Sequence, residues 1–581
     1  MTIYNFDKIS IISQTENTLK SEELTQIQNG EIALYKLILK FDGESSPKPY
    51  SLIWEEDQID IIGVWHSKIA LNRNITPDWN MRKIDSRTAS GMPLLSVYNK
   101  AGENRISVAL SDTASPASIM VGVVEENAKL RFKIDFFEAI CPKMSEYEVI
   151  IRIDRRKINA SNAIEDTRSW WLSLGCTFAH VPENARLPMY STWYSFHQHT
   201  IPEDIIRECE IAKKCGMDTV IVDDGWQTDD NSRGYAFCGD WKICKAKIPD
   251  MKDFVDKIHA LGMKFIIWFS VPYVGFESEN YEKFKGMYLN TRHLSRASVL
   301  DPRFKEVREF LVSTYCNYVK EYGWDGLKLD FIDSFALSEE SSCEYDKMDT
   351  ISLEVALEML LDEITVALKK INPEILIEFR QSYIGPIVSK YGNMFRVTDC
   401  PNDAIYNRVG SLDLRLTSGK IPVHSDMLMW HKDDTLQSVA YQLYAIMFSV
   451  PQISVKFDNI SCEQAKLLNS FLSFWRENQR VILDGDLIVQ GIDFGYTMAK
   501  TTLDNTSVCV LYEDVVATAS EAKSYIFNST GRDKIAIELD FGASVEIYDI
   551  FGSKYDEITL NAGIHRINAK NCEMIKVIKR S

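Results

Sequence analysis

The sequence predicts a multidomain protein of mixed α/β and all-β class, in which a central (β/α)8 TIM barrel lies between an N-terminal β-sandwich domain and a small C-terminal antiparallel β domain. Three observations indicate this fold. Apolar alternation fills the first third of the chain, buried apolar runs then alternate with amphipathic helical patterns, and alternation returns near the end. The expected domains are residues 1–182, 183–485 and 486–581.

The N-terminal domain is predicted from short alternating segments separated by turn-like stretches. The segments include "IALYKLILKF" and "SLIWEEDQIDIIGVW", and the turns include "FDGESSPKP" and "NKAGEN". Side chains that alternate between apolar and polar suit strands with one buried face. An all-β domain is therefore expected up to about residue 180.

The barrel is predicted from apolar runs of about five residues that alternate with helical patterns. The runs are "DTVIVDD", "MKFIIWFSVP", "GLKLDFI" and "ILIEFRQ", and the helical segments are "IPEDIIRECEIAKKCG", "DMKDFVDKIHALG", "RFKEVREFLVSTYCNYVKEYG" and "SLEVALEMLLDEITVALKKI". A strand that is covered on both faces loses its alternation, so repetition of this unit favours a (β/α)8 barrel. Beyond residue 486, "TSVCVLYEDVVATAS" and "SVEIYDIFGSKY" return to the alternation of a β domain.

Charge and composition exclude several classes of function. The net charge of −18 disfavours a nucleic-acid partner, because phosphate binding needs a basic face. The opening "MTIYNFDKIS" lacks the pattern of a signal peptide, and no apolar run is long enough to span a membrane. The twelve cysteines contain no CxxC pair, and the closest pairs, Cys209/Cys215 and Cys238/Cys244, lack zinc spacing, which favours reduced thiols and a cytoplasmic protein.

Polar residues at the carboxyl ends of barrel strands are the candidates for chemistry. In "VIVDDGWQ", Asp223 and Asp224 follow four apolar residues directly. Adjacent carboxylates repel each other, and a ligand with several hydroxyls would supply the donors that both need. The alternative is an acidic turn that caps the next helix.

The strand "GLKLDFID" carries Lys328 and Asp330 two residues apart and so on one face. A cation beside Asp330 would keep it ionised, as a nucleophile requires, although a structural ion pair is the alternative. Asp333 lies off that face and is expected to cap or orient. Trp268 ends the run "KFIIWFSVP" and is expected either to stack on a sugar ring or to pack in the core.

The stretch "RVTDCPNDAIYNR" at residues 396–408 holds two aspartates and two arginines and has no regular apolar pattern. Its position after "MFRV" predicts a strand that runs into a loop, which would place Asp399 at the barrel mouth. Two carboxylates from different strands, Asp330 and Asp399, can serve glycoside hydrolysis, one attacking the anomeric carbon and the other protonating the leaving oxygen.

Competing chemistries have no support in the sequence. It contains no GxSxG, phosphate-loop, HExxH or GxGxxG motif. His197 and His199 in "FHQHT" are expected to be loop or helix-entry residues and not metal ligands. No metal or cofactor is therefore expected.

At these residues the chain resembles the α-galactosidase (melibiase) group of glycoside hydrolases, family 36, in the clan that also holds families 27 and 31. Seven motifs occur in the matching order over about residues 186–410: "STWYSF", "VDDGWQ", "GDW" with a following "KIP", "FIIWFS", "VLDPRFKEVREFL", "GWDGLKLDF" and "TDCPNDAIYNR". The predicted order of domains agrees with that family over the rest of the chain.

The resemblance implies retaining double displacement, with Asp330 as nucleophile and Asp399 as acid/base. It also implies that Asp223 and Asp224 hold the 4- and 6-hydroxyls of an α-galactosyl unit and that Lys328 reaches a ring hydroxyl. Three further residues are implied in the substrate site: Trp268 and Trp193 would shape the pocket, and Arg296 would contact substrate. Asp403 and Arg408 follow in the family's pattern, with Arg408 either contacting a sugar hydroxyl or holding the loop.

One segment departs from the family. A cysteine and a glycine-rich turn commonly follow the strand-end glutamate there, whereas this sequence has "IEFRQSYIGP", in which Glu378 remains and Arg380 stands near the cysteine position. An arginine adds bulk and five donors, so the pocket wall is expected to differ around the 2- or 6-position of the sugar, and Arg380 is a further candidate for substrate binding.

The partner expected from these residues is an oligosaccharide or glycoside, with no nucleic acid and no membrane. Two alternatives to a hydrolase stay open: a transglycosylase like the raffinose synthases, whose "DDGWQ" is similar, and a non-catalytic carbohydrate-binding protein. Retention of Lys328, Asp330 and Asp399 argues against the second, because a binding protein needs no nucleophile. Relatives often form homo-oligomers, but the sequence shows no interface pattern.

Overall fold

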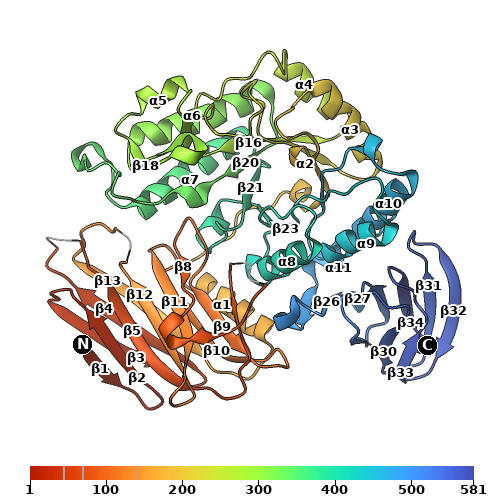
Figure 1. The fold of residues 1–581 in the computed structure, drawn as a ribbon, viewed down its shortest axis with the longest axis horizontal. Helices are drawn as coiled ribbons and strands as arrows, with labels where there is room; N and C mark the ends of the chain where they lie inside the picture. The colour runs from red at the N-terminus through yellow and green to blue at the C-terminus, as the bar shows by residue number, and fades with distance from the viewer. Residues whose placement is uncertain (44–45, 69–70, 139, 581) are drawn as a thin grey trace. The chain divides into compact units, whose positions relative to one another are not determined.

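The computed structural model describes residues 1–43, 46–68, 71–138 and 140–580 (Figure 1). The chain divides into two compact units. The first comprises Met1–His180, Gln227–Cys244 and Trp268–Asn393, and the second comprises Val181–Trp226, Lys245–Ile267 and the residues from Met394 onward. The strands of the predicted barrel therefore come from both units.

Two sheets form the N-terminal part of the chain. The first contains, in order, β1 (Thr2–Asn5), β2 (Ser10–Thr15), β5 (Tyr50–Asp57), β12 (Lys129–Phe136), β11 (Ala117–Val124) and β7 (Thr76–Pro77), with β8 (Ile84–Ser86) also on β11. The second contains β3 (Ser21–Gln28), β4 (Ile32–Lys40), β13 (Glu146–Asp154), β10 (Asn104–Leu110), β9 (Leu94–Tyr98) and β6 (Gly63–His66). Buried residues of both sheets share one hydrophobic core, which confirms the predicted sandwich.

A helix at the end of this region was not expected from the sequence, which predicts only strands up to about residue 180. Helix α1 (Ala160–Ser173) begins at Asn159, whose side chain accepts a hydrogen bond from the amide of Ser161. Its buried residues include Ala160, Ile164 and Trp171, which are spaced so that they lie on one face of the helix. The indole of Trp171 donates to the carbonyl of Leu110 on β10, at 2.8 Å. The all-β prediction is therefore wrong for residues 160–173.

Eight strands form the sheet of the barrel. Their order is β23 (Val423–His424), β22 (Met394–Arg396), β21 (Leu376–Arg380), β20 (Gly326–Asp330), β16 (Lys264–Ser270), β15 (Thr219–Val222), β14 (Met189–Ser191) and β24 (Gln452–Ile453). Neighbouring strands pair in parallel, for example β20 with β21. A parallel bridge between His424 and Val450 brings the two ends of the sheet together, so that the barrel is nearly closed, as predicted.

Helices follow most of these strands. They are α2 (Trp193–Phe196), α3 (Pro202–Lys214), α4 (Met251–Ala260), α5 (Glu279–Lys283), α6 (Lys305–Tyr322), α7 (Leu353–Ile371), α8 (Ala404–Ser418), α9 (Leu436–Ala445), α10 (Cys462–Glu477) and α11 (Gln479–Asp484). The four predicted helical segments form α3, α4, α6 and α7. Asp250 and Ser352 cap α4 and α7 by accepting a backbone hydrogen bond. Within the described ranges, no helix is both long and apolar enough to cross a membrane.

A small antiparallel sheet is inserted between β16 and α6. Its strands are β17 (Tyr273–Gly275), β19 (Ala297–Leu300) and β18 (Tyr288–Arg292), with β19 in the middle. The segment that connects β18 to β19 contains Arg296, which has a positive φ of 52°. The insertion thus carries one of the arginines that the resemblance places in the substrate site.

Two further sheets form the C-terminal part. One contains β25 (Asp486–Gln490), β26 (Met498–Leu503), β27 (Thr506–Leu511), β29 (Lys523–Asn528), β34 (Met574–Lys579), β31 (Ala543–Tyr548) and β32 (Lys554–Leu560), and the other contains β28 (Val516–Ala519), β30 (Ile535–Leu539) and β33 (Gly563–Ile567). The prediction of an antiparallel domain needs correction, because β27 pairs with β29, and β28 with β30, in parallel. The chain crosses to the second sheet at β28 and returns at β29, so these neighbours run in the same direction.

Candidate active site

The predicted nucleophile lies at the end of a buried strand. Lys328 and Asp330 belong to β20 and have exposed fractions of 4% and 6%. Directly after Asp330 the chain turns at Phe331, which has a φ of 64°. This turn lets the amide of Phe331 donate to Oδ1 of Asp330, at 2.8 Å. Local backbone geometry therefore fixes one oxygen of the carboxylate.

Two side chains also donate to Asp330, and the hydroxyl of a third lies near it. Nε1 of Trp268 on β16 lies 3.0 Å from Oδ2, Nε of Arg380 on β21 lies 2.6 Å from Oδ1, and the hydroxyl of Tyr383 lies 3.3 Å from Oδ1. Trp268 is buried and uses its indole N–H on the carboxylate, an arrangement that neither stacking nor core packing alone describes. Such donors stabilise the ionised form of a carboxylic acid.

Arg380 is held in a defined position beside Asp330. Its guanidinium lies 5.1 Å from the ring centroid of Phe331 and 5.7 Å from that of Tyr383. Nη1 donates to the carbonyl of Gln381 at 2.7 Å and lies 3.9 Å from Oδ2 of Asp333. Burial raises the pKa of the Asp333 carboxyl, Arg380 opposes that shift, and the charge of Asp330 adds to it. The guanidinium thus lies between two carboxylates.

The N-terminal sandwich reaches the loops that follow β20 and β21. Arg87, one residue beyond β8, donates to the backbone carbonyl of Asp333 at 2.9 Å. The hydroxyls of Ser90 and Ser382 lie 2.9 Å apart. The amide of Gly91 donates to the carbonyl of Ser382. Sandwich residues therefore help to position the segment around the predicted nucleophile.

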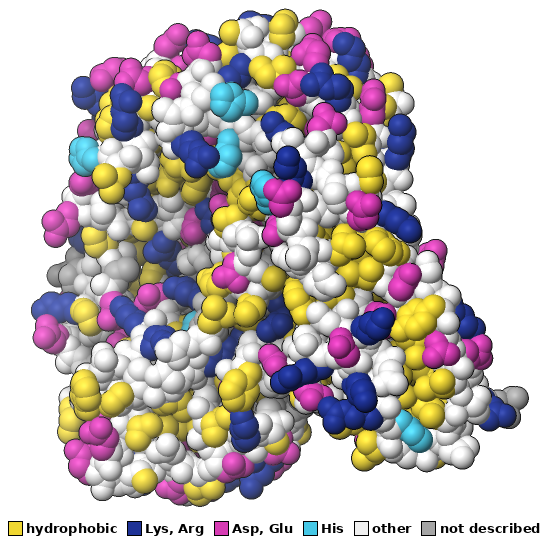
Figure 2. Space-filling model, turned by 45° about the vertical axis from the view of Figure 1, so that its right-hand side comes forward, with side chains coloured by type: hydrophobic (Ala, Val, Ile, Leu, Met, Phe, Trp, Pro, Cys, Tyr) yellow, Lys and Arg dark blue, Asp and Glu magenta, His cyan; other side chains and the backbone are white. Residues whose placement is uncertain are grey.

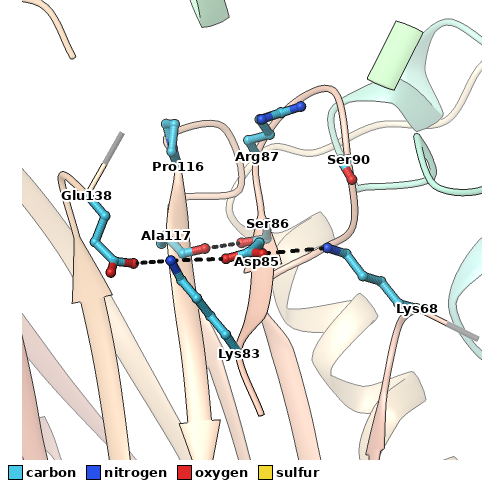
Figure 3. A pocket seen from close by; sticks show the side chains of 9 residues that line it. All are labelled: Lys68, Lys83, Asp85, Ser86, Arg87, Ser90, Pro116, Ala117 and Glu138. Atoms are coloured by element: carbon cyan, nitrogen blue, oxygen red, sulfur yellow. Dashed lines mark hydrogen bonds and ion pairs between the residues drawn. The ribbon is translucent and has the colours of Figure 1, made fainter. Parts of the chain in front are cut away.

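Arg87 and Ser90 also line a cavity of about 280 Å³ in the sandwich (Figure 3). Lys83 pairs there with Glu138 at 2.8 Å and with Asp85 at 3.5 Å. In Figure 3 the Arg87 side chain extends away from this network of ion pairs. Oppositely charged side chains thus pair with each other along the cavity wall.

The predicted acid/base lies in the loop after β22. The side chain of Asp399 is 51% exposed, and one carboxylate oxygen lies 2.9 Å from Nη1 of Arg396. Arg396 ends β22 and has an exposed side-chain fraction of 1%. The helix α8 begins at Ala404, capped by Asp403, so residues 404–408 are helical and not part of the predicted loop. The strand-to-loop prediction holds for Arg396 through Asp403.

Asp426 is a buried carboxylate that the sequence interpretation missed. Its Oδ1 lies 2.6 Å from Nη1 of Arg396, and its Oδ2 accepts from the Tyr194 hydroxyl at 2.9 Å and the Cys400 amide at 2.7 Å. Burial raises the pKa of Asp426 to about 6, Arg396 opposes the shift, and the charge of Asp399 adds to it. The buried guanidinium of Arg396 therefore pairs with both Asp399 and Asp426. The signal that could have revealed it is a polar "HSD" at the end of a strand.

Asp223 and Asp224 directly follow β15, as predicted, and each is 2% exposed. Asp224 accepts a hydrogen bond from Nε2 of Gln198 at 2.8 Å, and the amide of Asp223 donates to the Thr192 hydroxyl at 3.0 Å. The next residue, Gly225, has a φ of 114°, and a Cβ there would lie 2.4 Å from Cα of Gln198. The close approach of these two segments therefore requires glycine.

The other predicted substrate residues occupy varied positions. Trp193 begins α2, and its ring centroid lies 4.4 Å from that of His197, which directly follows this helix. Arg296 is exposed and pairs with Glu277. Arg408 is buried in α8.

Arg408 contacts the C-terminal sheet region. Its Nε donates to the carbonyl of Gly495 at 2.9 Å, and its guanidinium lies 4.3 Å from the ring centroid of Tyr512. The sequence predicts two alternative roles for Arg408, and these contacts fit the one in which Arg408 holds the loop in position. Contact with a sugar hydroxyl stays a prediction.

No group of three or more histidine, cysteine, aspartate and glutamate side chains that could hold a metal ion occurs among the residues that the structure describes. The side chains gathered at the strand ends are instead carboxylates with arginine, tyrosine and tryptophan donors. Carboxylates at the strand ends of a parallel barrel are groups that glycoside hydrolysis can use.

Part of the chain is similar to known proteins. The sequence model of the melibiase family matches residues 186–390. Alpha-galactosidase Mel36A of Lactobacillus acidophilus is 28% identical over 152 residues, which are 23% of this chain and 19% of that protein. Alpha-galactosidase AgaA of Geobacillus stearothermophilus is 28% identical over 135 residues, which are 22% of this chain and 18% of that protein. The aligned part thus spans about a fifth of these relatives.

Solved structures share the fold over nearly the whole chain. The GH36 alpha-galactosidase AgaA superposes with a TM-score of 0.63 and 13% identity, covering 98% of this chain and 81% of that one. The alpha-galactosidase from Lactobacillus brevis gives a TM-score of 0.65 and 13% identity, covering 99% and 82%. AgaA variants have been crystallised with raffinose and with stachyose. The chain therefore shares the fold of GH36 alpha-galactosidases, and the melibiase match lies within its barrel region.

Proposed function

We propose that this protein is a retaining exo-glycosidase that removes terminal α-galactosyl units from oligosaccharides or glycosides. The melibiase domain and the relatives named alpha-galactosidases support the substrate class. The observation that carries the proposal is the setting of Asp330, a buried strand-end carboxylate bonded by Trp268 and Arg380. These donors favour the ionised carboxylate that a nucleophile requires, and the strand end is where barrels of this kind carry their chemistry.

In the first step of the proposed reaction, Asp330 attacks the anomeric carbon as the bond to the leaving oxygen breaks. Asp399 donates a proton to that oxygen, and a galactosyl ester of Asp330 forms. In the second step, water attacks the same carbon, Asp399 takes its proton, and Asp330 leaves as a carboxylate. Two inversions give overall retention.

The neighbours of each carboxylate suit these roles. The Arg380 cation favours the ionised form of Asp330, which a nucleophile requires. Asp399 is half exposed, which suits a group that must exchange protons with water. Its partner Arg396 is shared with the buried Asp426, so the negative charge of Asp426 offsets the cation that would otherwise hold Asp399 ionised.

We propose that four residues bind the galactosyl unit. Asp223 and Asp224 accept from its 4- and 6-hydroxyls, Lys328 reaches a ring hydroxyl, and Trp193 shapes the pocket. Carboxylates that accept from an axial 4-hydroxyl discriminate between epimers, because the wrong epimer leaves buried acceptors unpaired.

We further propose a reducing, cytoplasmic location. All twelve cysteines are free thiols: five are buried, five are partly buried, and Cys343 and Cys462 are exposed. Free thiols in this number suit a reducing compartment. Assembly into a homo-oligomer stays a prediction.

The experiment is steady-state hydrolysis of p-nitrophenyl glycosides: α- and β-galactoside, α-glucoside, β-L-arabinopyranoside and α-N-acetylgalactosaminide. Asp330→Ala is measured beside Asp504→Asn, a control at an exposed carboxylate that pairs with Arg480. We expect release from the α-galactoside by the wild type and the control and its loss in Asp330→Ala. Activity confined to another glycoside would contradict the proposed sugar, and equal activity in Asp330→Ala would contradict the proposed nucleophile.

A further inference from the structure

Both oxygens of Asp330 accept hydrogen bonds. Oδ1 accepts from Nε of Arg380 and the amide of Phe331, at 2.6 and 2.8 Å, and lies 3.3 Å from the hydroxyl of Tyr383, which also lies 3.0 Å from the carbonyl of Leu329. Oδ2 accepts from the indole of Trp268 at 3.0 Å. The charged donor Arg380 lies on Oδ1, which suits that oxygen to carry the charge of a departing carboxylate, so we assign Oδ2 as the oxygen that bonds to the anomeric carbon. Oδ1 would then be the carbonyl oxygen of a glycosyl ester.

We propose that Arg380 is a catalytic residue that assists the second step, in which the ester is hydrolysed, and that Asp333 balances its charge while the ester exists. This inference rests on the proposed function, since it assumes that Asp330 forms the ester. It assigns Arg380 to the reacting carboxylate and not to the sugar substituent that the sequence alone suggests.

The assistance follows from the balance of charge in that step. The water oxygen forms a bond to the anomeric carbon and gives its proton to Asp399, while the carbon–Oδ2 bond breaks and its electron pair returns to Asp330. The new negative charge spreads to Oδ1, which faces the Arg380 guanidinium. A charged donor at that oxygen makes the carboxylate a weaker base and therefore a better leaving group.

The Arg380 side chain is only 14% exposed, so a second carboxylate beside it can balance its charge while Asp330 is esterified. Oδ2 of Asp333 lies 3.9 Å from Nη1 of Arg380. The charge of Asp330 is one cause of the raised pKa of Asp333, so forming the ester favours ionised Asp333. The guanidinium would then pair with Asp333 until Asp330 regains its charge.

The Arg380 environment supports this exchange of partners. The planar guanidinium of Arg380 lies near the rings of Phe331 and Tyr383, and its Nη1 donates a hydrogen bond to the carbonyl of Gln381. Arg87 helps to fix the loop that carries Asp333, because its guanidinium donates a hydrogen bond to the backbone carbonyl of Asp333. The cation can thus change carboxylate without moving far, because both lie within 4 Å of it.

The test compares the two steps in Arg380→Gln and Arg380→Lys. The substrate is 2,4-dinitrophenyl α-galactoside, whose phenolate leaves without protonation, so ester formation is fast and hydrolysis of the ester limits kcat. Removing a cation beside a carboxylate changes its basicity by about 1–3 pKa units, so we expect kcat of Arg380→Gln to fall about tenfold or more. We expect kcat/KM to change by less than about threefold, because it reports ester formation.

Two further signatures separate a slow second step from a disturbed pocket. Arg380→Gln should release about one equivalent of dinitrophenol in a burst, and methanol, which competes with water for the ester, should raise its kcat. Arg380→Lys keeps the charge and should show a smaller fall in kcat. Equal losses in kcat and kcat/KM without a burst would overturn the inference.

Asp333→Asn and Arg87→Gln complete the design. Asp333→Asn removes this counter-ion from the ester state, so the variant should lower kcat/KM and show no burst. Arg87→Gln loosens the same loop without touching Asp330, and we expect kcat and kcat/KM to fall together. A burst in Asp333→Asn, or unchanged kcat/KM there, would overturn the role of Asp333. A wild type that releases no dinitrophenol would overturn the proposed function itself, whereas an active wild type with burst-free Arg380→Gln would overturn only this inference.

Discussion

Nε of Arg380 lies 2.6 Å from Oδ1 of Asp330, and the two residues end neighbouring parallel strands, β21 and β20. The segment that departs most from the family pattern thus contacts the predicted nucleophile directly. Arg380 in this segment places a positive charge beside Asp330, in addition to any effect that its bulk has on the pocket wall. Activity and its dependence on pH should therefore respond to the charged neighbours of both proposed catalytic carboxylates.

Asp399→Asn should separate substrates by the quality of their leaving group. General acid catalysis contributes about 10²- to 10⁴-fold, so kcat/KM for raffinose should fall within that range. A dinitrophenyl galactoside needs no proton on its leaving group and should lose far less. Rates with both substrates check this, with Asp433→Asn as an exposed carboxylate control. Equal losses for the two substrates would rule out an acid role for Asp399.

Asp426→Asn should move the basic limb of the pH profile. Asp426, with a pKa of about 6, is ionised at neutral pH, and its negative charge favours the protonated form of its neighbour Asp399. Removing that charge lets Asp399 lose its proton at lower pH, so the basic limb of kcat/KM should shift downward by about one unit. A uniform loss of activity with an unchanged limb would show that Asp426 has only a structural role.

Arg408→Ala should reduce stability more than substrate binding. The variant loses a hydrogen bond to the Gly495 carbonyl and a contact with Tyr512, together about 1.5–3 kcal/mol. We expect a lower Tm and an unchanged KM for the α-galactoside. A raised KM at unchanged Tm would instead favour contact between Arg408 and a sugar hydroxyl.

His66 should make the N-terminal sandwich sensitive to acid. Burial, with the nearby cations Arg82, Arg73 and Lys68, lowers its pKa from 6.5 to about 3. The unfolded state therefore binds a proton that the folded state rejects, and stability falls as pH drops from about 6.5 toward 3. The loss between pH 7 and pH 5 should be about 2 kcal/mol.

His66→Leu removes this proton and should flatten that part of the stability curve. Denaturant unfolding followed at pH 7 and pH 5 checks it, provided that the sandwich transition is resolved. An equal fall in stability in wild type and variant over this interval would contradict the assignment to His66.

The strand-end pattern made the barrel and the nucleophile predictable. "GLKLDFID" and "VIVDDGWQ" place polar residues directly after apolar runs, and the structure has Asp330, Asp223 and Asp224 at those ends. Local periodicity carries this information because a buried parallel strand is apolar until it reaches the barrel mouth.

The partners of these residues could not be predicted, because they come from distant parts of the chain. Arg396 and Asp426 are 30 residues apart, and Arg380 and Asp330 are 50 apart. A sequence shows that such charges exist but not which of them meet. Helix α1 was missed for a different reason, since its tryptophan-rich end resembles the strands before it.

The stereochemistry of the first product tests the central claim most directly. Hydrolysis of p-nitrophenyl α-galactoside is followed by ¹H NMR before mutarotation. We predict that α-galactose appears first, as an ester of Asp330 requires. Initial β-galactose would contradict double displacement, and no galactose release would contradict the proposed substrate.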